Sequence, residues 1–269
     1  MEPAADGLAD LVATEYPDVR LSDMMLAPAT REQLERVLDE QRHRDLLGSH
    51  GFAPLHALLF TGSAGTGKSM TAAALATELS LPLVTIRIDA LISKYTGETA
   101  AKLRVVFDAM AHPRTVYLFD DLDAIGERQI FWPDIVDARR ILTMFLSFLD
   151  GAQPESLIVA VADHPTLLDD ALLSRFDAVI AYYPPDSAQS LDLLRRRLGA
   201  MDTSAVSWDE IGNHVKGLSQ ARLVRAAESA AKRAILSGSD SVSTSALVTS
   251  LRELRRIHHA TGFSIGAWA

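Results

Sequence analysis

Short apolar runs recur along the first two thirds of the chain and predict buried strands. Most of them are not interrupted by alternating polar residues, which is typical of strands covered on both faces. Five runs have this character: Ala57–Thr61, Leu83–Ile88, Val116–Phe119, Leu157–Val161 and Val179–Tyr182. Between them, helical spacing or composition predicts helices over Thr71–Leu79, Ala100–Met110 and Ile135–Leu149. The alternation predicts a parallel α/β sheet sandwiched by helices.

The pattern changes after Pro184-Pro185, where the strand signals stop and only helices are predicted. These helices cover Ser187–Leu198, Trp208–Val215, Ser219–Leu236 and Thr244–Ile257, with Ser219 and Thr244 as N-caps. We therefore predict four parts in chain order. An N-terminal segment (1–20) with a weak amphipathic pattern precedes an α/β domain (21–184), a small all-helical domain (185–259) and an apolar tail (260–269).

The composition narrows the class of protein. With 48% hydrophobic and 23% charged residues, and no apolar run near the roughly 20 residues that span a bilayer, the 269-residue chain is typical of a soluble protein. The acidic N-terminus does not look like a secretory signal, so we expect a cytoplasmic protein with no membrane contact. The absence of cysteine excludes disulfides, and the scattered histidines do not suggest a zinc site. A net charge of −9 argues against nucleic acid as a partner.

One loop carries a specific phosphate-binding pattern. The residues Gly62, Ser63, Ala64, Gly65, Thr66, Gly67, Lys68 and Ser69 follow the first predicted strand, and a helix begins near Met70. We predict that these residues, Met70 included, bind the nucleotide. In such a loop the backbone N–H groups wrap the phosphates of ATP, Lys68 reaches the β and γ oxygens, and Ser69 binds Mg²⁺. A second Mg²⁺ carboxylate is needed from a neighbouring strand end, and Asp120 follows Val116–Phe119, 52 residues after Lys68.

Four motifs, in order and spacing, resemble those of AAA ATPases, and in particular the small bacterial single-ring members. They are Gly62–Ser69, Ser93–Glu98, Asp120–Ile125 and Leu168–Asp177, and the likeness covers roughly Leu21 to Ile257. The resemblance implies a P-loop α/β domain with a helical lid, ATP bound between them and at the subunit boundaries of a ring, usually a hexamer. It also implies that ATP hydrolysis remodels or threads a protein substrate.

The resemblance assigns a pore loop to Lys94, Tyr95 and Thr96. In the family, an aromatic residue at the position of Tyr95 lines the central pore and grips extended polypeptide. An aromatic face can contact any backbone without reading its sequence. The alternative is that Tyr95 is an ordinary half-buried residue at the start of a helix.

Several arginines are candidates for nucleotide contacts. Arg222 opens a helix where the family places its second sensor, although a solvated surface arginine fits the position equally well. Arg175 is the candidate for the arginine finger that crosses into a neighbouring subunit's site. Arg139-Arg140 and Arg195–Arg197 are interpreted as exposed helix faces, with a contact to a neighbour's nucleotide as an alternative for the first pair.

Three positions depart from the family pattern, and all three lie on the hydrolytic side of the site. Asp121 replaces the glutamate that polarises the attacking water, and its carboxylate lies about 1.5 Å further back. Asp163 replaces the usual asparagine and adds negative charge beside a triphosphate, although it could take over the role of Asp121. Ser174 stands where the family often has a second arginine before Arg175.

These observations leave two main hypotheses. The first is an active AAA ATPase that forms a ring and remodels or threads a protein substrate. The second is a nucleotide-binding, hydrolysis-poor AAA subunit whose ATP state controls assembly or a partner effector. A DNA-handling protein is a third hypothesis, which the acidic charge and the lack of a DNA-binding motif oppose.

Overall fold

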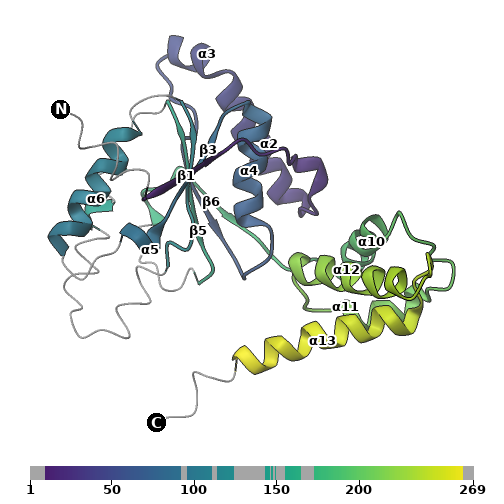
Figure 1. Cartoon of the computed structure of the whole chain (residues 1–269). Coiled ribbons are helices and arrows are strands. Elements are labelled where there is room, and N and C mark those ends of the chain that lie inside the picture. The colour runs from purple at the N-terminus through teal and green to yellow at the C-terminus, as the bar shows by residue number, and fades with distance from the viewer. Residues whose placement is uncertain are drawn as a thin grey trace. The chain divides into compact units, whose positions relative to one another are not determined.

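The computed structural model describes residues 10–91, 96–110, 114–123, 143–145, 147, 149, 155–164 and 173–262 (Figure 1). The chain divides into two compact units. The first comprises residues 1–62 and 68–182, and the second comprises residues 63–67 and 183–269. Each unit has a separate hydrophobic core. The middle of the phosphate-binding loop therefore groups with the helical part of the chain.

A six-stranded sheet forms the centre of the first unit, with the strand order β1-β3-β4-β5-β2-β6. All neighbouring strands are parallel except β1, which runs antiparallel to β3. The strands are β1 (Val12–Glu15), β2 (Ala57–Thr61), β3 (Leu83–Ile86), β4 (Val116–Phe119), β5 (Leu157–Ala162) and β6 (Ala178–Ala181). The predicted fold class, a largely parallel α/β sheet followed by helices, is confirmed.

The central strands β2, β4 and β5 are buried on both faces because helices cover both (Figure 1). Side chains alternate across the sheet, so Leu59 of β2 packs on one face and its neighbours Leu58 and Phe60 pack on the other. Helix α6 (Thr96–Ala109) covers the face of Leu59, whereas α2 (Pro28–Arg42) and α4 (Lys68–Leu79) cover the opposite face. This explains why the strands lack polar alternation.

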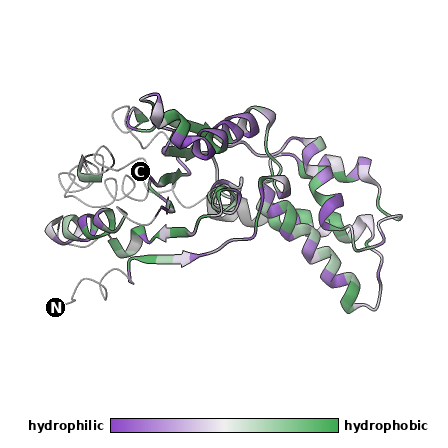
Figure 2. Cartoon of the chain, turned by 90° about the horizontal axis from the view of Figure 1, so that it is seen from above, coloured by the Kyte–Doolittle hydropathy of each residue, from purple (hydrophilic) through white to green (hydrophobic). Residues whose placement is uncertain are grey.

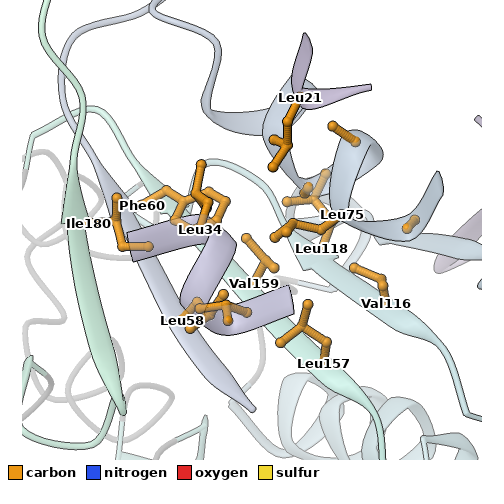
Figure 3. Close-up of a cluster of buried hydrophobic side chains, with 14 of the residues drawn as sticks. Leu21, Leu34, Leu58, Phe60, Leu75, Val116, Leu118, Leu157, Val159 and Ile180 are labelled. Carbon is orange, nitrogen blue, oxygen red and sulfur yellow. The ribbon is translucent and has the colours of Figure 1, made fainter. Parts of the chain in front are cut away.

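The core beneath α2 and α4 is built from apolar side chains that come from both the helices and the sheet. Figure 3 shows Leu34 of α2 and Leu75 of α4 gathered with Leu58, Phe60 and Val159 of the sheet. All five side chains are fully buried. Burying a side chain of this size stabilises the fold by about 1.5–3 kcal/mol. This packing fixes α4 against the sheet, and α4 carries Lys68 at its first position.

Three aromatic rings pack together on the face of β4 that α6 covers. The ring of Phe119 at the end of β4 lies 5.7 Å from that of Phe107 on α6 and 5.1 Å from that of Phe145. Phe107 and Phe145 also meet edge to face at 5.8 Å. Edge-to-face and offset contacts of this kind add about 0.5–1.5 kcal/mol per pair beyond burial. The strand end that precedes Asp120 is therefore held rigidly.

Several elements near the N-terminus do not appear among the elements predicted from the sequence. These are β1, the 3₁₀ turn η1 (Leu21–Asp23), α2 and the short α3 (Arg44–Ser49). Strand β1 joins the sheet edge through the pairing of Val12 with Ile86. Pro28 stands at the start of α2, where its missing N–H costs no helical hydrogen bond.

Some predicted boundaries were wrong by a few residues. Strand β3 ends at Ile86, because Ile88 begins the short helix α5 (Ile88–Leu91). Helix α4 begins three residues before the predicted Thr71, and α6 begins four residues before the predicted Ala100. Of the predicted helix over 135–149, residues 143–145, 147 and 149 are helical, and the others lie outside the described residues.

The second unit contains the helices α10 (Ser187–Arg197), α11 (Trp208–Val215), α12 (Gln220–Leu236) and α13 (Thr244–Gly262). Figure 2 shows that hydrophobic and hydrophilic residues both occur along its helices. The hydrophobic stripes meet in a core that includes Leu194, Ile211, Leu223 and Leu251. Across the residues that the structure describes, no helix is both long and apolar enough to span a bilayer.

The ends of these helices differ in part from the prediction. Asp186 caps α10 in a reciprocal capping box with Gln189. Ser219 is the residue before α12, but its side chain makes no capping hydrogen bond. Thr244 is the first helical residue of α13. The hydroxyl of Ser243 accepts a hydrogen bond from the N–H of Ala246 at 3.2 Å. The cap of α13 is thus one residue earlier than predicted.

The arginine cluster on α10 is exposed, as predicted, but it also connects helices of the second unit. The Arg195 guanidinium lies 4.7 Å from the ring centre of Trp208 on α11. Arg197 pairs with Glu228 on α12. Arg139-Arg140 lie outside the described residues. Arg196 pairs with Asp192 of the same helix at 2.9 Å, so all three α10 arginines have structural partners.

Candidate nucleotide-binding site

Three predicted site segments meet at one edge of the sheet. Gly62 directly follows β2, Asp120 follows β4 and Asp163 follows β5. These three strands are adjacent, in the order β4-β5-β2, and parallel. Their carboxyl ends therefore lie at the same edge, where open α/β sheets bind their ligands.

The start of the loop leaves no space for a side chain. Gly62 has φ of +133°, and a Cβ built there would lie 2.1 Å from the backbone oxygen of Tyr182. The Gly62 N–H donates to the carbonyl of Ala162 at 3.2 Å, while the Tyr182 N–H donates to Thr61 at 2.7 Å. The chain leaves the sheet here in a conformation that only glycine can adopt without a clash.

The centre of the loop is fixed by contacts within the second unit. The Thr66 hydroxyl, fully buried, donates to the carbonyl of Ser63 at 2.8 Å. The N–H of Ala221, in the first turn of α12, donates to the Gly65 carbonyl at 3.1 Å, and the Gln220 side chain donates to the Thr66 carbonyl at 3.2 Å. The loop carbonyls thus have partners, which favours a fixed loop conformation.

Lys68 is buried, and its side chain contacts oxygens of Gly62 and Asp163. Its side chain is 4% exposed, and its Nζ donates to the Gly62 carbonyl at 2.5 Å. The same nitrogen lies 2.6 Å from a carboxylate oxygen of Asp163. The sequence predicted Lys68 as a phosphate ligand, and it did not predict this ion pair. The signal for the pair was the aspartate at the end of β5, which was assigned only to hydrolysis.

Ser69 and Asp120, predicted to hold Mg²⁺, lie together. The Ser69 hydroxyl donates to the Asp120 carboxylate at 3.0 Å. Both groups offer the hard oxygen ligands that Mg²⁺ prefers, and Mg²⁺ sites commonly use one or two protein oxygens together with substrate phosphates. The residues therefore fit this ion. When bound there, Mg²⁺ would neutralise phosphate charge.

Asp121, the candidate water-activating residue, has a left-handed backbone with φ of +56°. Aspartate tolerates this conformation better than most residues. Partial burial raises the pKa of its carboxyl above the usual value, and neighbouring carboxylates raise it further. Those neighbours are Asp120, Asp163 and Asp123, with Lys68 acting in the opposite direction. A raised pKa suits a general base that must accept a proton near neutral pH.

Asp123 positions the end of β5, a role that the sequence did not reveal. Its carboxylate is 4% exposed and accepts the backbone N–H of Asp163 at 3.0 Å and of His164 at 2.9 Å. Two hydrogen bonds to a buried carboxylate fix the backbone from which Asp163 projects. The available signal was the repeated acidic pattern of Asp120, Asp121 and Asp123, in which only the first two were assigned a role.

Arg175 lies near the amino ends of the parallel strands, whereas Lys68 of the same chain lies near their carboxyl ends. Asp177, two residues later, accepts the N–H groups of His56 and Ala57 at the start of β2, at 2.8 and 2.9 Å. The phosphate loop follows the other end of β2, and at about 3.3 Å per residue the strand separates its two ends by roughly 15 Å. Arg175 itself is exposed.

Asp177 is a second residue whose role only the structure reveals. Burial alone would raise its pKa, but hydrogen bonds from the His56 ring and from two backbone N–H groups outweigh burial. Together with the attraction of His56, they lower the pKa of Asp177 to about 2. The carboxylate therefore stabilises the join between β2 and the segment of Arg175.

The remaining predicted residues are less closely associated with the site. Met70 is 45% exposed in the first turn of α4. Arg222 is half-buried in the first turn of α12, within the second unit. Lys94 and Tyr95 lie outside the described residues, and Thr96 is the first residue of α6. The structure thus gives no contact of the predicted pore loop.

Taken with the fold, the loop, lysine, serine and strand-end aspartate define a P-loop nucleotide-binding protein. Comparison with known proteins gives the family. Residues 58–183 match the family described as "ATPase family associated with various cellular activities (AAA)". The chain belongs to the AAA family, whose members are described as ATPases.

Three relatives illustrate the breadth of the similarity. An uncharacterized AAA family ATPase of Sinorhizobium fredii is 32% identical over 69% of this chain and 56% of its own length. An ATP-dependent zinc metalloprotease FtsH of Acidothermus cellulolyticus is 30% identical over 84% of this chain and 36% of its own length. A proteasome-activating nucleotidase of Methanocaldococcus jannaschii is 27% identical over 78% and 51%, respectively.

The chain matches only part of each relative, between about a third and just over half of their lengths. Two of these relatives are named for proteolysis, one as a metalloprotease and the other as an activator of the proteasome. The similarity therefore shows a shared ATPase module.

Proposed function

We propose that this protein binds ATP with Mg²⁺, assembles into a ring, most simply a hexamer, and uses slow ATP hydrolysis to remodel or thread a protein substrate. The observation that carries the proposal is the meeting of Lys68, Ser69 and Asp120 at the carboxyl edge of β2 and β4. A basic group, a hydroxyl and a carboxylate in this arrangement suit a Mg²⁺-bound triphosphate.

Each part of the site has a separate task in this proposal. The backbone N–H groups of the loop and Lys68 bind the phosphates, and Ser69 and Asp120 hold Mg²⁺. Asp121 accepts the proton of the attacking water, because its raised pKa and its position after Asp120 suit a base. Asp163 contributes negative charge at the carboxyl ends of the strands. Arg222 of α12 is the candidate for a further contact with the nucleotide.

The proposed ring has support from the place of Arg175. Because Asp177 ties that segment to the start of β2, Arg175 is separated by the length of the strand from its own phosphate loop. An exposed arginine there is suited to reach a neighbouring subunit instead. Oligomers of identical subunits commonly complete such sites across their interfaces.

The substrate part of the proposal rests on the resemblance alone. Lys94, Tyr95 and Thr96 would face the central pore and grip extended polypeptide through the aromatic ring. A hydrolysis-poor subunit that controls a partner effector is the second candidate. Two observations favour it: Asp121 has a short reach, and Asp163 already pairs with Lys68.

A mixing experiment tests both the ATPase activity and the ring. Arg175→Ala keeps the phosphate site but lacks the finger, whereas Lys68→Ala lacks the site but keeps the finger. We expect each variant alone to be nearly inactive in steady-state ATP hydrolysis, and an equimolar mixture to regain measurable turnover. Arg104→Ala, on the exposed face of α6, is the matched arginine control. A mixture no faster than either variant would contradict the role of Arg175 across subunits.

A further inference from the structure

Lys68, the residue that should meet the phosphates, is already paired with a carboxylate. The distance from its Nζ to Asp163 is 2.6 Å, and the side chains are 4% and 28% exposed, respectively. In such partly dehydrated surroundings the attraction between opposite charges is much stronger than in water. A phosphate oxygen that binds Lys68 must therefore share it with Asp163 or displace it.

The backbone that carries Asp163 is held in place. Its backbone N–H and that of His164 are both bound by the buried Asp123 carboxylate. It also follows β5, which lies between the strands that carry the phosphate loop and Asp120. This fixed backbone keeps the Asp163 carboxylate within reach of Lys68. Asp120 and Asp121, which follow the neighbouring parallel strand β4, place further carboxylates at the same edge.

The β-phosphate and the γ-phosphate feel this charge differently. The loop N–H groups surround the β-phosphate and offset its charge. A terminal phosphate bound to Lys68 on the side of β5 would come within about 5 Å of the Asp163 carboxylate, two hydrogen-bond lengths away. At an effective dielectric constant of about 20, repulsion at that distance can lower affinity by roughly a hundredfold.

We propose that Asp163 is a specificity-determining residue that makes this site prefer a nucleoside diphosphate to a triphosphate. The inference rests on the proposed function, because it concerns the same nucleotide site. The preference for a diphosphate has a regulatory consequence. The terminal phosphate is accepted well only when further positive charge, such as an arginine of a neighbouring subunit, offsets Asp163.

The test is isothermal titration calorimetry of the full chain with Mg²⁺ and either ADP or a non-hydrolysable ATP analogue. Three proteins are compared: wild type, Asp163→Asn and Asp39→Asn. The asparagine has the size of the aspartate but no charge. Asp39 is an exposed residue of α2, paired with His43, so its variant controls for the loss of one negative charge. Thermal unfolding checks that all three proteins are folded.

We expect wild type to bind ADP at least about tenfold more tightly than the analogue. In Asp163→Asn the ratio of the two affinities should shift at least tenfold toward the analogue, because repulsion of the terminal phosphate is removed. Asp39→Asn should leave the ratio unchanged.

Two results would overturn the inference. If Asp163→Asn raises both affinities by the same factor, Asp163 competes for Lys68 but does not distinguish the terminal phosphate. If wild type already binds both nucleotides equally, there is no preference to explain. A third result, no binding of either nucleotide by folded wild type or Asp163→Asn, would overturn the proposed nucleotide-binding function and this inference with it.

Discussion

The phosphate-binding half and the hydrolytic half of the candidate nucleotide site depend on different physical features. The phosphate-binding half, Gly62 to Ser69, is set by backbone geometry: Gly62 admits no side chain, and Thr66 closes the loop through Ser63. The hydrolytic half depends on the reach and charge of Asp121 and Asp163. A change of one methylene at Asp121 alters the second half and leaves the first intact. At Asp121, binding and turnover are therefore separable, whereas Asp163 pairs with Lys68 and acts on both.

Charge sharpens the same contrast. Lys68 is a cation beside the phosphate loop, whereas the hydrolytic half brings together Asp120, Asp121 and Asp163. Partial burial is the largest cause of the raised pKa of the Asp121 carboxyl, and repulsion from Asp120 and Asp163 raises it further. Nucleotide binding is expected to depend strongly on Mg²⁺, because a divalent cation offsets these charges.

The largest effect is expected from Lys68→Ala, which removes the cation of the phosphate-binding half. Affinity for Mg²⁺-ADP should fall at least about a hundredfold, because charge-assisted contacts in a buried site are lost. Titration calorimetry measures this directly. Lys232→Ala, on the exposed surface of α12, should bind as wild type does. Affinity within a few fold of wild type for Lys68→Ala would show that the loop binds phosphate without its lysine.

Gly62→Ala tests the backbone of the phosphate-binding half. The new Cβ would meet the Tyr182 carbonyl, so we expect a loss of about 2–4 kcal/mol in the free energy of unfolding, together with weaker nucleotide binding. Urea denaturation provides the measurement.

A matched control for this glycine lies on α11. A Cβ at Gly212 would meet only Leu191, at 3.9 Å, so Gly212→Ala should stabilise the helix by about 0.5–1 kcal/mol. Equal behaviour of the two variants would mean that the approach of Tyr182 does not constrain the loop.

A smaller effect is expected from Asp177→Asn, which loosens the segment of Arg175. The folded-state pKa of Asp177 is about 2, below its ordinary value of 3.8. The carboxylate therefore stabilises the fold above pH 3.8, and this contribution is lost as pH falls through 2. Because the side chain is one third exposed, we expect the variant to lose only about 1–2 kcal/mol at pH 7.

The measurement is urea denaturation of both proteins from pH 7 to pH 3. The difference between them should shrink toward the acid end. Asp45→Asn, whose carboxylate is fully exposed on α3, should change stability by less than about 0.5 kcal/mol. A difference for Asp177→Asn that stays constant with pH would assign its effect to packing and not to the carboxylate charge.

Much of the sheet was predictable from the sequence, because strands buried on both faces must be apolar throughout. Strand β1 gave no such signal: Ala13, Thr14 and Glu15 are exposed, and its pairing is decided by β3. Helix α2 did carry a signal, the helical spacing of Leu34, Val37 and Leu38, although it is not among the predicted elements.

The site was predictable where a motif prescribes contacts, as for Ser69 and Asp120. It was not predictable where a side chain finds its partner through the fold. Lys68 and Asp163 are 95 residues apart, and Asp177 is 121 residues from His56. Spacing along the chain cannot reveal such pairs, because they depend on strand order and on which sheet edge each residue occupies.

The central claim is that Asp121 limits turnover in a site that otherwise binds nucleotide well. Its most direct test is the steady-state turnover number for ATP of Asp121→Glu beside wild type and Asp121→Asn. The glutamate restores about 1.5 Å of reach, and a misplacement near 1 Å can cost about a hundredfold in rate. We predict at least tenfold faster turnover for the glutamate, a loss for the asparagine, and unchanged nucleotide affinity for both. Turnover of Asp121→Glu equal to or below that of wild type would contradict the claim.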